Sequence, residues 1–289
     1  MSPYPALPDF VIVGAMKSAT TSLYSWLRDQ PDVFMAHPKE TNFFSRAKDW
    51  GRGIQWYEAQ FAGALPGQLK GEASVDYSSP ERSTVAAQRM SSIVPYAKLV
   101  YVIRHPIDRL RSHYRHEVQR GRERRSLIEA LEEPDNPYVG NSLYYRCLLP
   151  YVERFPRDQI LVVRFDDLIR DGDQGWRNVL AFLGLPDRNV LRVARNVTRE
   201  KTQYTAAVGV LKRMHLLRYH SRFPTPIRKI GKLVFTRGGE GFQARLDESL
   251  VGIPQGITGP IWNDLASLEN WLGVADPLWD PRTDAAQPA

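Results

Sequence analysis

The sequence predicts an α/β fold of three layers, in which a central, mostly parallel β-sheet has helices on both faces. Three apolar runs rich in β-branched residues predict the strands: Phe10–Val13, Leu99–Ile103 and Ile160–Leu168. The first two runs are continuously apolar and the third begins with four apolar residues, as in strands that are buried on both faces of a parallel sheet. The first two runs lead through a turn into apolar residues at helical spacing, which is typical of helical connections between parallel strands.

The composition is that of one globular domain. The chain has 289 residues, of which 43% are hydrophobic and 25% are charged. This length suits a single α/β domain, which we expect over residues 1–275, with a flexible tail at 276–289. A single cysteine, Cys147, excludes an internal disulfide and is expected in the core. The net charge of +7 favours anionic ligands, but no recognisable nucleic-acid motif accompanies it.

The first strand runs into a turn that is suited to binding a phosphate. Gly14 ends the strand, and a helix with Leu23 and Leu27 on one face follows. The start of a helix leaves backbone N–H groups unpaired at the positive end of its dipole, where phosphates bind. Lysine and hydroxyl groups add further donors in this turn. The predicted phosphate turn consists of Lys17, Ser18, Ala19, Thr20, Thr21 and Ser22.

The spacing in this turn argues against an ATP-binding Walker A loop. Such a loop places its lysine directly before the Ser or Thr that contacts magnesium, whereas Lys17 comes early, three residues after Gly14. The order Lys-Ser-Ala-Thr-Thr-Ser instead resembles the 5′-phosphosulfate loop of sulfotransferases that use 3′-phosphoadenosine 5′-phosphosulfate (PAPS). Ala19 replaces the usual glycine. The alternative is an ordinary strand–helix turn with a solvated lysine.

The second predicted strand ends in another motif of the same family. Residues 104–112 contain the complete pattern Arg-x-Pro-x-Asp-Arg-x-x-Ser, with Pro106 at the start of a helix. The resemblance implies that Arg104 and Ser112 bind the 3′-phosphate of PAPS, and a guanidinium fork suits a phosphate. Arg109 is expected either behind the site or in solvent. His113 is expected on a helix surface rather than in a metal site, since no third ligand is evident.

Glu40 is the residue that we expect to act as the general base. Residues 39–44 resemble the Lys-Glu-Pro-His-Phe-Phe motif of heparan-sulfate-type sulfotransferases, and Thr41 and Asn42 depart from it. Sulfuryl transfer requires a base within reach of the acceptor's proton, and a carboxylate can serve. The alternative for Glu40 is a surface salt bridge with Lys39. The resemblance places Lys39 and Phe43 near the acceptor.

Residues 70–77 resemble a further segment of the family pattern, Gly-Glu-Lys/Ala-Ser-Pro-x-Tyr, which borders the acceptor site in that family. Here the resemblance implies acceptor-side roles for Glu72 and Tyr77. Glu72 is a rival base, or a structural carboxylate paired with an arginine. Arg199 and Lys201 lie where the family places a late loop over the nucleotide. Residues 200–260 are expected to form a lid or an acceptor-side segment, and the role of the basic stretch 211–235 stays open.

Together these motifs identify a P-loop-like, PAPS-dependent sulfotransferase that resembles the bacterial and heparan-sulfate or carbohydrate types. It would move the sulfuryl group of PAPS to a hydroxyl, or alternatively an amine, of a carbohydrate, glycolipid or small metabolite, with Lys17 stabilising the leaving phosphate and no metal. The alternatives are a phosphotransferase that uses ATP, with Asp166 or Asp167 as magnesium ligand, and a non-catalytic nucleotide-binding regulator. The proline-rich start and the absence of a long apolar stretch predict a cytoplasmic bacterial protein.

Overall fold

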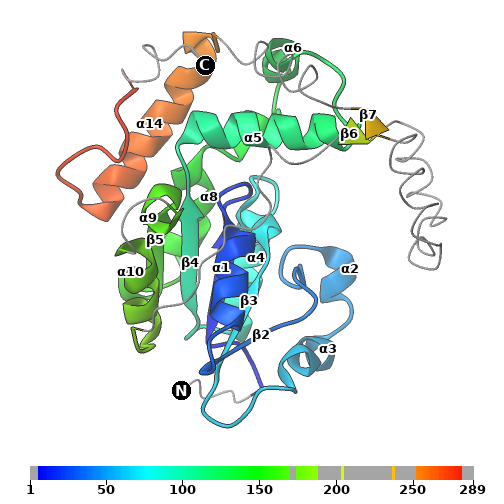
Figure 1. Cartoon of the computed structure of the whole chain (residues 1–289), viewed down its shortest axis with the longest axis vertical. Coiled ribbons are helices and arrows are strands. Elements are labelled where there is room, and N and C mark those ends of the chain that lie inside the picture. Colours follow the sequence, from blue (N-terminus) through cyan, green and yellow to red (C-terminus); the bar gives the residue numbers. More distant parts are fainter. Residues whose placement is uncertain (1–5, 170–173, 188–202, 205–235, 238–251, 282–289) are drawn as a thin grey trace.

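A five-stranded sheet forms the centre of the protein. The computed structural model describes residues 6–169, 174–187, 203–204, 236–237 and 252–281 (Figure 1). The strand order is β2-β3-β1-β4-β5, and all four pairings are parallel. The strands are β1 (Phe10–Gly14), β2 (Val33–Met35), β3 (Leu69–Ala73), β4 (Lys98–Ile103) and β5 (Ile160–Arg164). The predicted three-layer α/β fold is therefore confirmed. The short strands β6 (Gln203–Tyr204) and β7 (Thr236–Arg237) form a separate antiparallel pair.

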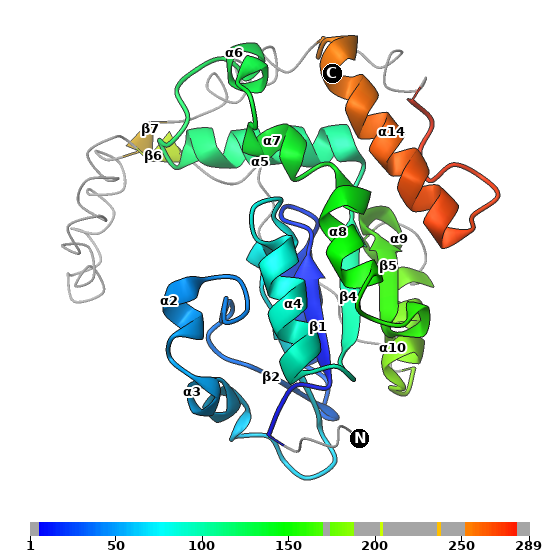
Figure 2. The same cartoon turned by 180° about the vertical axis from the view of Figure 1, so that it is seen from behind.

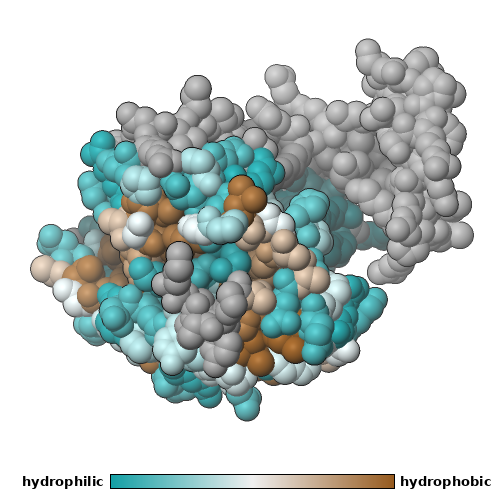
Figure 3. Space-filling view, turned by 90° about the horizontal axis from the view of Figure 1, so that it is seen from below, coloured by the Kyte–Doolittle hydropathy of each residue, from teal (hydrophilic) through white to brown (hydrophobic). Residues whose placement is uncertain are grey.

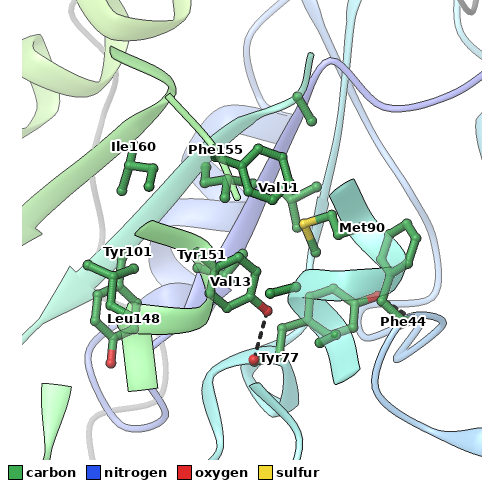
Figure 4. Close-up of a cluster of buried hydrophobic side chains, with 14 of the residues drawn as sticks. Val11, Val13, Phe44, Tyr77, Met90, Tyr101, Leu148, Tyr151, Phe155 and Ile160 are labelled. Carbon is green, nitrogen blue, oxygen red and sulfur yellow. Dashed lines mark hydrogen bonds between the residues drawn. The ribbon is translucent and has the colours of Figure 1, made fainter. Parts of the chain in front are cut away.

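Successive residues of β1 supply two different hydrophobic cores, one on each face of the sheet. Phe10 and Ile12 pack with α1 (Thr20–Arg28) and α10 (Gln174–Leu183), which lie in front of the sheet in Figure 1. Val11 and Val13 pack with α4 (Ser83–Ile93) and α8 (Tyr144–Val152), which lie in front in Figure 2. Figure 4 shows part of this second core. Because side chains alternate along a strand, a continuous apolar run serves both faces.

Helix α5 (Pro106–Gln119) crosses the end of the sheet where β4 finishes (Figures 1 and 2). It begins as predicted, with Pro106 at its first turn and Asp108 close behind. A third hydrophobic core joins α5 to α6 (Leu127–Glu132), α7 (Pro137–Gly140) and α14 (Gln255–Leu272). Helix α14 also docks on α8, since Asp264 accepts hydrogen bonds from the backbone N–H groups of Tyr145 and Arg146 at 2.8 and 2.9 Å. These groups lie in the first turn of α8 and have no partners within that helix.

Several predicted elements have different bounds in the structure. Residues 47–61 form α2 (Ala47–Trp50), α3 (Ile54–Glu58) and the 3₁₀ turn η1 (Ala59–Phe61), and Gly53, with a φ of 81°, separates α2 from α3. The strand expected to reach residue 168 ends at residue 164, where α9 (Phe165–Ile169) begins with two aspartates in its first turn. Part of the expected tail makes contacts: the Leu278 N–H donates to Glu269 Oε1 at 2.7 Å.

The amino ends of the strands lie at the opposite end of the molecule from α5. Figure 3 views this end, where hydrophobic residues are interspersed with hydrophilic ones. A cavity of about 670 Å³ lies there, lined by η1, by the loop that follows it and by the first residues of β3. It is separated by the length of the sheet from the turn predicted to bind phosphate. Among the described residues, no helix combines the length and the apolar character needed to cross a bilayer.

We expect Gly14→Ala to destabilise the protein, whereas Gly259→Ala should not. A Cβ atom on Gly14 would lie 1.9 Å from Ser78 Oγ and 2.9 Å from Tyr101 Cε2. Such overpacking typically costs about 1–3 kcal/mol. A Cβ on Gly259, within α14, meets no atom inside 4 Å, and alanine in a helix is favoured over glycine by about 0.5–1 kcal/mol. Urea unfolding of both variants measures the difference, and equal midpoints would contradict the packing described for Gly14.

Candidate active site

The predicted functional residues meet at the carboxyl edge of the sheet because of the strand order. Glu40 follows β2, Glu72 lies near the end of β3, Lys17 follows β1 and Arg104 follows β4. These four strands are consecutive neighbours in the sheet. The connection from β1 runs to one side of the sheet, to β2, while β4 lies on the other side of β1. Ligands of open parallel sheets bind at such a switch point, outside the carboxyl ends of the strands.

The turn after β1 leaves hydrogen-bonding groups available for an anion. The Ala15 N–H donates to Val102 O at 2.7 Å, which fixes the start of the turn on β4. Helix α1 then begins at Thr20 with no side-chain cap on its first N–H groups. Within the described residues the buried Ser18 Oγ makes no hydrogen bond. Buried polar groups are normally paired, so this cradle fits the phosphate that the sequence predicts.

Ala19 takes a backbone conformation that usually belongs to glycine. Its φ is 64° and its ψ is 20°, and Lys17 two residues earlier has a φ of 72°. A left-handed conformation costs an L-amino acid roughly 1–2 kcal/mol. The family's usual glycine at this place would avoid that cost. The turn therefore keeps the glycine-type backbone although the glycine itself is absent.

Arg104 is held at the end of β4 with its guanidinium partly exposed. The hydroxyl of Tyr144 donates to Arg104 O at 2.7 Å and accepts from the Arg104 N–H at 3.3 Å. The guanidinium lies 4.8 Å from the ring centre of Phe165 and 3.7 Å from Asp108 Oδ2. Within the described part of the chain, the buried Arg104 Nε has no hydrogen-bond partner. Ser112, two turns along α5, is buried. These groups fit a second phosphate.

Arg109 and His113 are buried, which corrects the expectation of a surface histidine and excludes the solvated position that was one of two expected for Arg109. Arg109 is fully buried and donates to Ser142 Oγ at 2.8 Å, to Tyr138 O and toward His113 Nδ1 at 3.3 Å. Burial, and after it the charge of Arg109, lowers the pKa of His113 to about 2, and Lys17 contributes in the same direction. His113 is therefore a neutral imidazole, near enough to the phosphate turn for the charge of Lys17 to act on it. In the hydrogen bonds among the described residues, Arg109 has no carboxylate partner.

Glu40 is joined to the phosphate turn by Lys39. The Lys39 ammonium donates to Glu40 Oε1 at 3.3 Å and to Thr21 Oγ1, at the start of α1, at 3.5 Å. The side chains of Lys39 and Glu40 are only 14% and 24% exposed. The salt bridge considered for this pair is therefore present, but it lies in the site rather than on an open surface. It brings the carboxylate next to the residues predicted to bind the donor.

Glu72 has no arginine partner in the described structure, so the expected pairing is wrong. Its carboxyl group is fully buried, and Thr41 Oγ1 donates to Glu72 Oε2. Burial raises the pKa of Glu72 to about 7, the hydroxyls of Thr41, Tyr77 and Tyr57 oppose that rise, and the charge of Glu40 adds to it. Phe43 and Tyr77 are buried as well. In this structure these side chains offer no surface to an acceptor, although they were predicted to bind one.

The remaining predicted residues divide into two groups. Arg199, Lys201 and residues 211–235 lie outside the described residues. Asp167, a candidate magnesium ligand in the phosphotransferase alternative, is bound by Arg164 through hydrogen bonds of 2.6 and 2.9 Å. Thr41 had been noted only as a departure from the family motif. In the structure its hydroxyl donates to Glu72 and accepts from the Phe43 N–H. The sequence signal that could have indicated this role is a hydroxyl-bearing residue directly after the predicted base.

We expect Glu72→Gln to flatten the pH dependence of stability. The folded protein raises the pKa of Glu72 from 4.5 to about 7, so it binds more protons than the unfolded chain between these values. Stability from this group is complete below pH 4.5 and falls as the pH rises through 7, by roughly 3 kcal/mol at about 1.4 kcal/mol per unit. Urea unfolding at pH 5 and 8 measures the loss. The exposed Glu132→Gln is the matched control, and the same pH dependence in both variants would contradict the prediction.

Comparisons with known proteins place the chain in a family. The model of the sulfotransferase domain matches residues 7–222. The chain is 32% identical over 208 residues to human bifunctional heparan sulfate N-deacetylase/N-sulfotransferase 3, covering 63% of this chain and 23% of that protein. It is 31% identical over 194 residues to human heparan sulfate glucosamine 3-O-sulfotransferase 5, covering 63% and 55%. The matches thus span about a quarter and about half of these relatives.

Solved structures agree with this result. A sulfotransferase from Alicyclobacillus acidocaldarius superposes with a TM-score of 0.62 at 26% identity, over 92% of this chain and 96% of that one. The sulfotransferase domain from the curacin biosynthetic pathway, at 15% identity and a TM-score of 0.54, shares the fold over 91% of this chain and 98% of its own. The family predicted from the two phosphate motifs is confirmed. This chain belongs to the sulfotransferase domain family.

Proposed function

We propose that the protein transfers the sulfuryl group of PAPS to a hydroxyl group, or alternatively an amine, of an acceptor. The observation that carries this proposal is the position of Lys39, whose ammonium binds both Glu40 and Thr21 of the phosphate turn. A candidate base is thereby held beside a candidate phosphosulfate site. Two further features support it: the anion-binding groups after β1 and β4, and membership of the sulfotransferase family.

The donor would be bound at both of its phosphate-bearing ends. We assign the 5′-phosphosulfate to Lys17 together with the backbone and hydroxyl groups of residues 18–22, and the 3′-phosphate to Arg104 and Ser112. Arg199 and Lys201 are proposed to approach the nucleotide as well. A 3′-phosphate site is what would distinguish PAPS from ATP or AMP. We propose no metal ion, since Lys17 and the start of α1 supply positive charge where the leaving phosphate becomes more negative.

The reaction would be an in-line displacement at sulfur. The acceptor oxygen forms a bond to sulfur while the bond between sulfur and the bridging phosphate oxygen breaks. Glu40 takes the proton of the acceptor hydroxyl, and the electron pair of the broken bond stays on the phosphate of adenosine 3′,5′-bisphosphate (PAP). A positioned base contributes about 10²–10⁴ in rate to such a step. The acceptor is proposed to be a carbohydrate, glycolipid or small metabolite, and the cytoplasmic location stays a prediction.

PAP should bind more tightly than 5′-AMP or ATP in the absence of magnesium. Arg104→Ala should weaken PAP about 10- to 100-fold, because a hydrogen bond to a charged group contributes about 1.5–3 kcal/mol. AMP, which lacks the 3′-phosphate, should be affected less. Isothermal titration calorimetry measures all three ligands, with Arg177→Ala as a control on the exposed side of α10. Tighter binding of ATP, above all with magnesium, would support the phosphotransferase instead.

Glu40→Gln should separate an enzyme from a nucleotide-binding regulator. In this variant PAP binding should change less than about threefold, while release of PAP from PAPS should fall about 100-fold or more. The assay supplies PAPS with a panel of probe acceptors that includes heparan sulfate, which the names of two relatives mention. Release of PAP that is the same in the variant as in the natural protein would show that Glu40 is not the base.

A further inference from the structure

The segment that follows Glu40 is held in place by side-chain hydroxyl groups. The N–H groups of Asn42, Phe43 and Phe44 donate to Ser74 Oγ, Thr41 Oγ1 and Tyr77 Oη, at 3.1, 3.4 and 3.4 Å. The position of Glu40 therefore depends on these hydroxyls.

We propose that Glu72 is a positioning residue for Glu40 and that it acts through Thr41. This inference rests on the proposed function, in which Glu40 is the base. Thr41 Oγ1 donates to Glu72 Oε2 and lies 3.1 Å from Tyr77 Oη, while it accepts from the Phe43 N–H. One hydroxyl thus joins the carboxyl group, the tyrosine and the backbone. Since Thr41 is the neighbour of Glu40 in the chain, holding Thr41 fixes the backbone that carries the base.

Glu72 is itself fixed to the donor side of the site. It belongs to β3 and is paired with Val11 of β1, the strand that leads into the phosphate turn. Behind the segment, Phe43 stacks on Tyr57 at 4.4 Å, and the Tyr77 carbonyl accepts from the Tyr151 hydroxyl at 2.8 Å (Figure 4). Two hydrogen bonds thus connect the segment around Glu40 to the donor side of the site. The buried one runs from Thr41 to Glu72, and the partly buried one runs from Lys39 to Thr21. A displacement of about 1 Å in a catalytic group can cost about 100-fold in rate.

The hydrogen bond from Thr41 to Glu72 should depend on pH, because its strength depends on the charge of Glu72. The titratable groups that face it are Glu40, Tyr57 of α3, Tyr77 of the 3₁₀ turn η2 (Val75–Ser78) and Tyr151 of α8. Glu72 Oε1 is buried without a hydrogen-bond partner in the described structure. Ionisation of Glu72, whose pKa is about 7, strengthens the bond that Thr41 donates, because hydrogen bonds to charged acceptors are the stronger ones. The backbone of residues 42–44 should therefore change its environment when Glu72 ionises.

Variants at Thr41 test the proposal in the full chain. Thr41→Val removes the hydroxyl and keeps the shape, so turnover of PAPS with heparan sulfate as probe acceptor should fall at least tenfold. Thr41→Ser restores the hydroxyl and should recover turnover to within about threefold. PAP affinity by calorimetry and the midpoint of urea unfolding test whether both variants keep the donor site and the fold. Thr84→Val, at an exposed position on α4, is the matched control.

A second measurement needs no acceptor. In NMR spectra of the PAP complex, the amide signals of residues 42–44 should shift with a midpoint near pH 7, and Glu72→Gln should abolish that shift. Unchanged turnover in Thr41→Val, or amide shifts that persist in Glu72→Gln, would overturn the positioning role. Failure of PAP to bind the natural protein would instead overturn the proposed function, so the two failures are distinguishable.

Discussion

The parallel pairing of β1 with β4 and with β3 is the constraint on which the site depends. The register sets Phe10 opposite both Lys98 and Gly71, so the three strands finish at the same edge. The chain therefore leaves the sheet at that edge after each of β1, β3 and β4. The phosphate turn, the arginine after β4 and the buried carboxyl of β3 are neighbours for this reason. Gly14 permits the turn to begin where Ser78 and Tyr101 leave no space for a Cβ atom.

The distribution of charge follows from this arrangement. On the donor side the charge of Arg104 acts on Arg109, whose buried guanidinium is bonded to neutral partners, and the charge of Lys17 acts on His113. On the acceptor side two carboxyl groups differ in exposure: Glu40 is 24% exposed and paired with Lys39, whereas Glu72 is buried among hydroxyls. In the proposed function, a donor with several phosphate charges would meet the cations, and the proton of the acceptor would meet the carboxyl group of Glu40. The carboxyl edge of the sheet therefore provides a cationic environment for the donor and a carboxyl group for the acceptor.

The sequence could predict the parts of the fold that depend on local patterns. Continuous apolar runs predicted β1, β4 and β5, and the phosphate motifs predicted the family. Strand β3 carries Gly71 and Glu72, which are unfavourable in strands, so its pattern did not indicate one. The burial of His113 and the hydroxyl partners of Glu72 depend on contacts between residues that are distant in the chain. The spacing of residues in the sequence does not show which distant residues come into contact, so these two features could be identified only in the structure.

The departures from the family motif at residues 41 and 42 match the needs of the local backbone. Asn42 has a φ of 52°, a left-handed conformation that asparagine tolerates better than most residues. Thr41 supplies the hydroxyl that the buried carboxyl of Glu72 and the Phe43 N–H both require. A threonine and an asparagine therefore replace the motif's residues without releasing Glu40 from its place. At these two positions the backbone path and the hydrogen bonds are the feature that the site needs, and more than one pair of side chains can satisfy it.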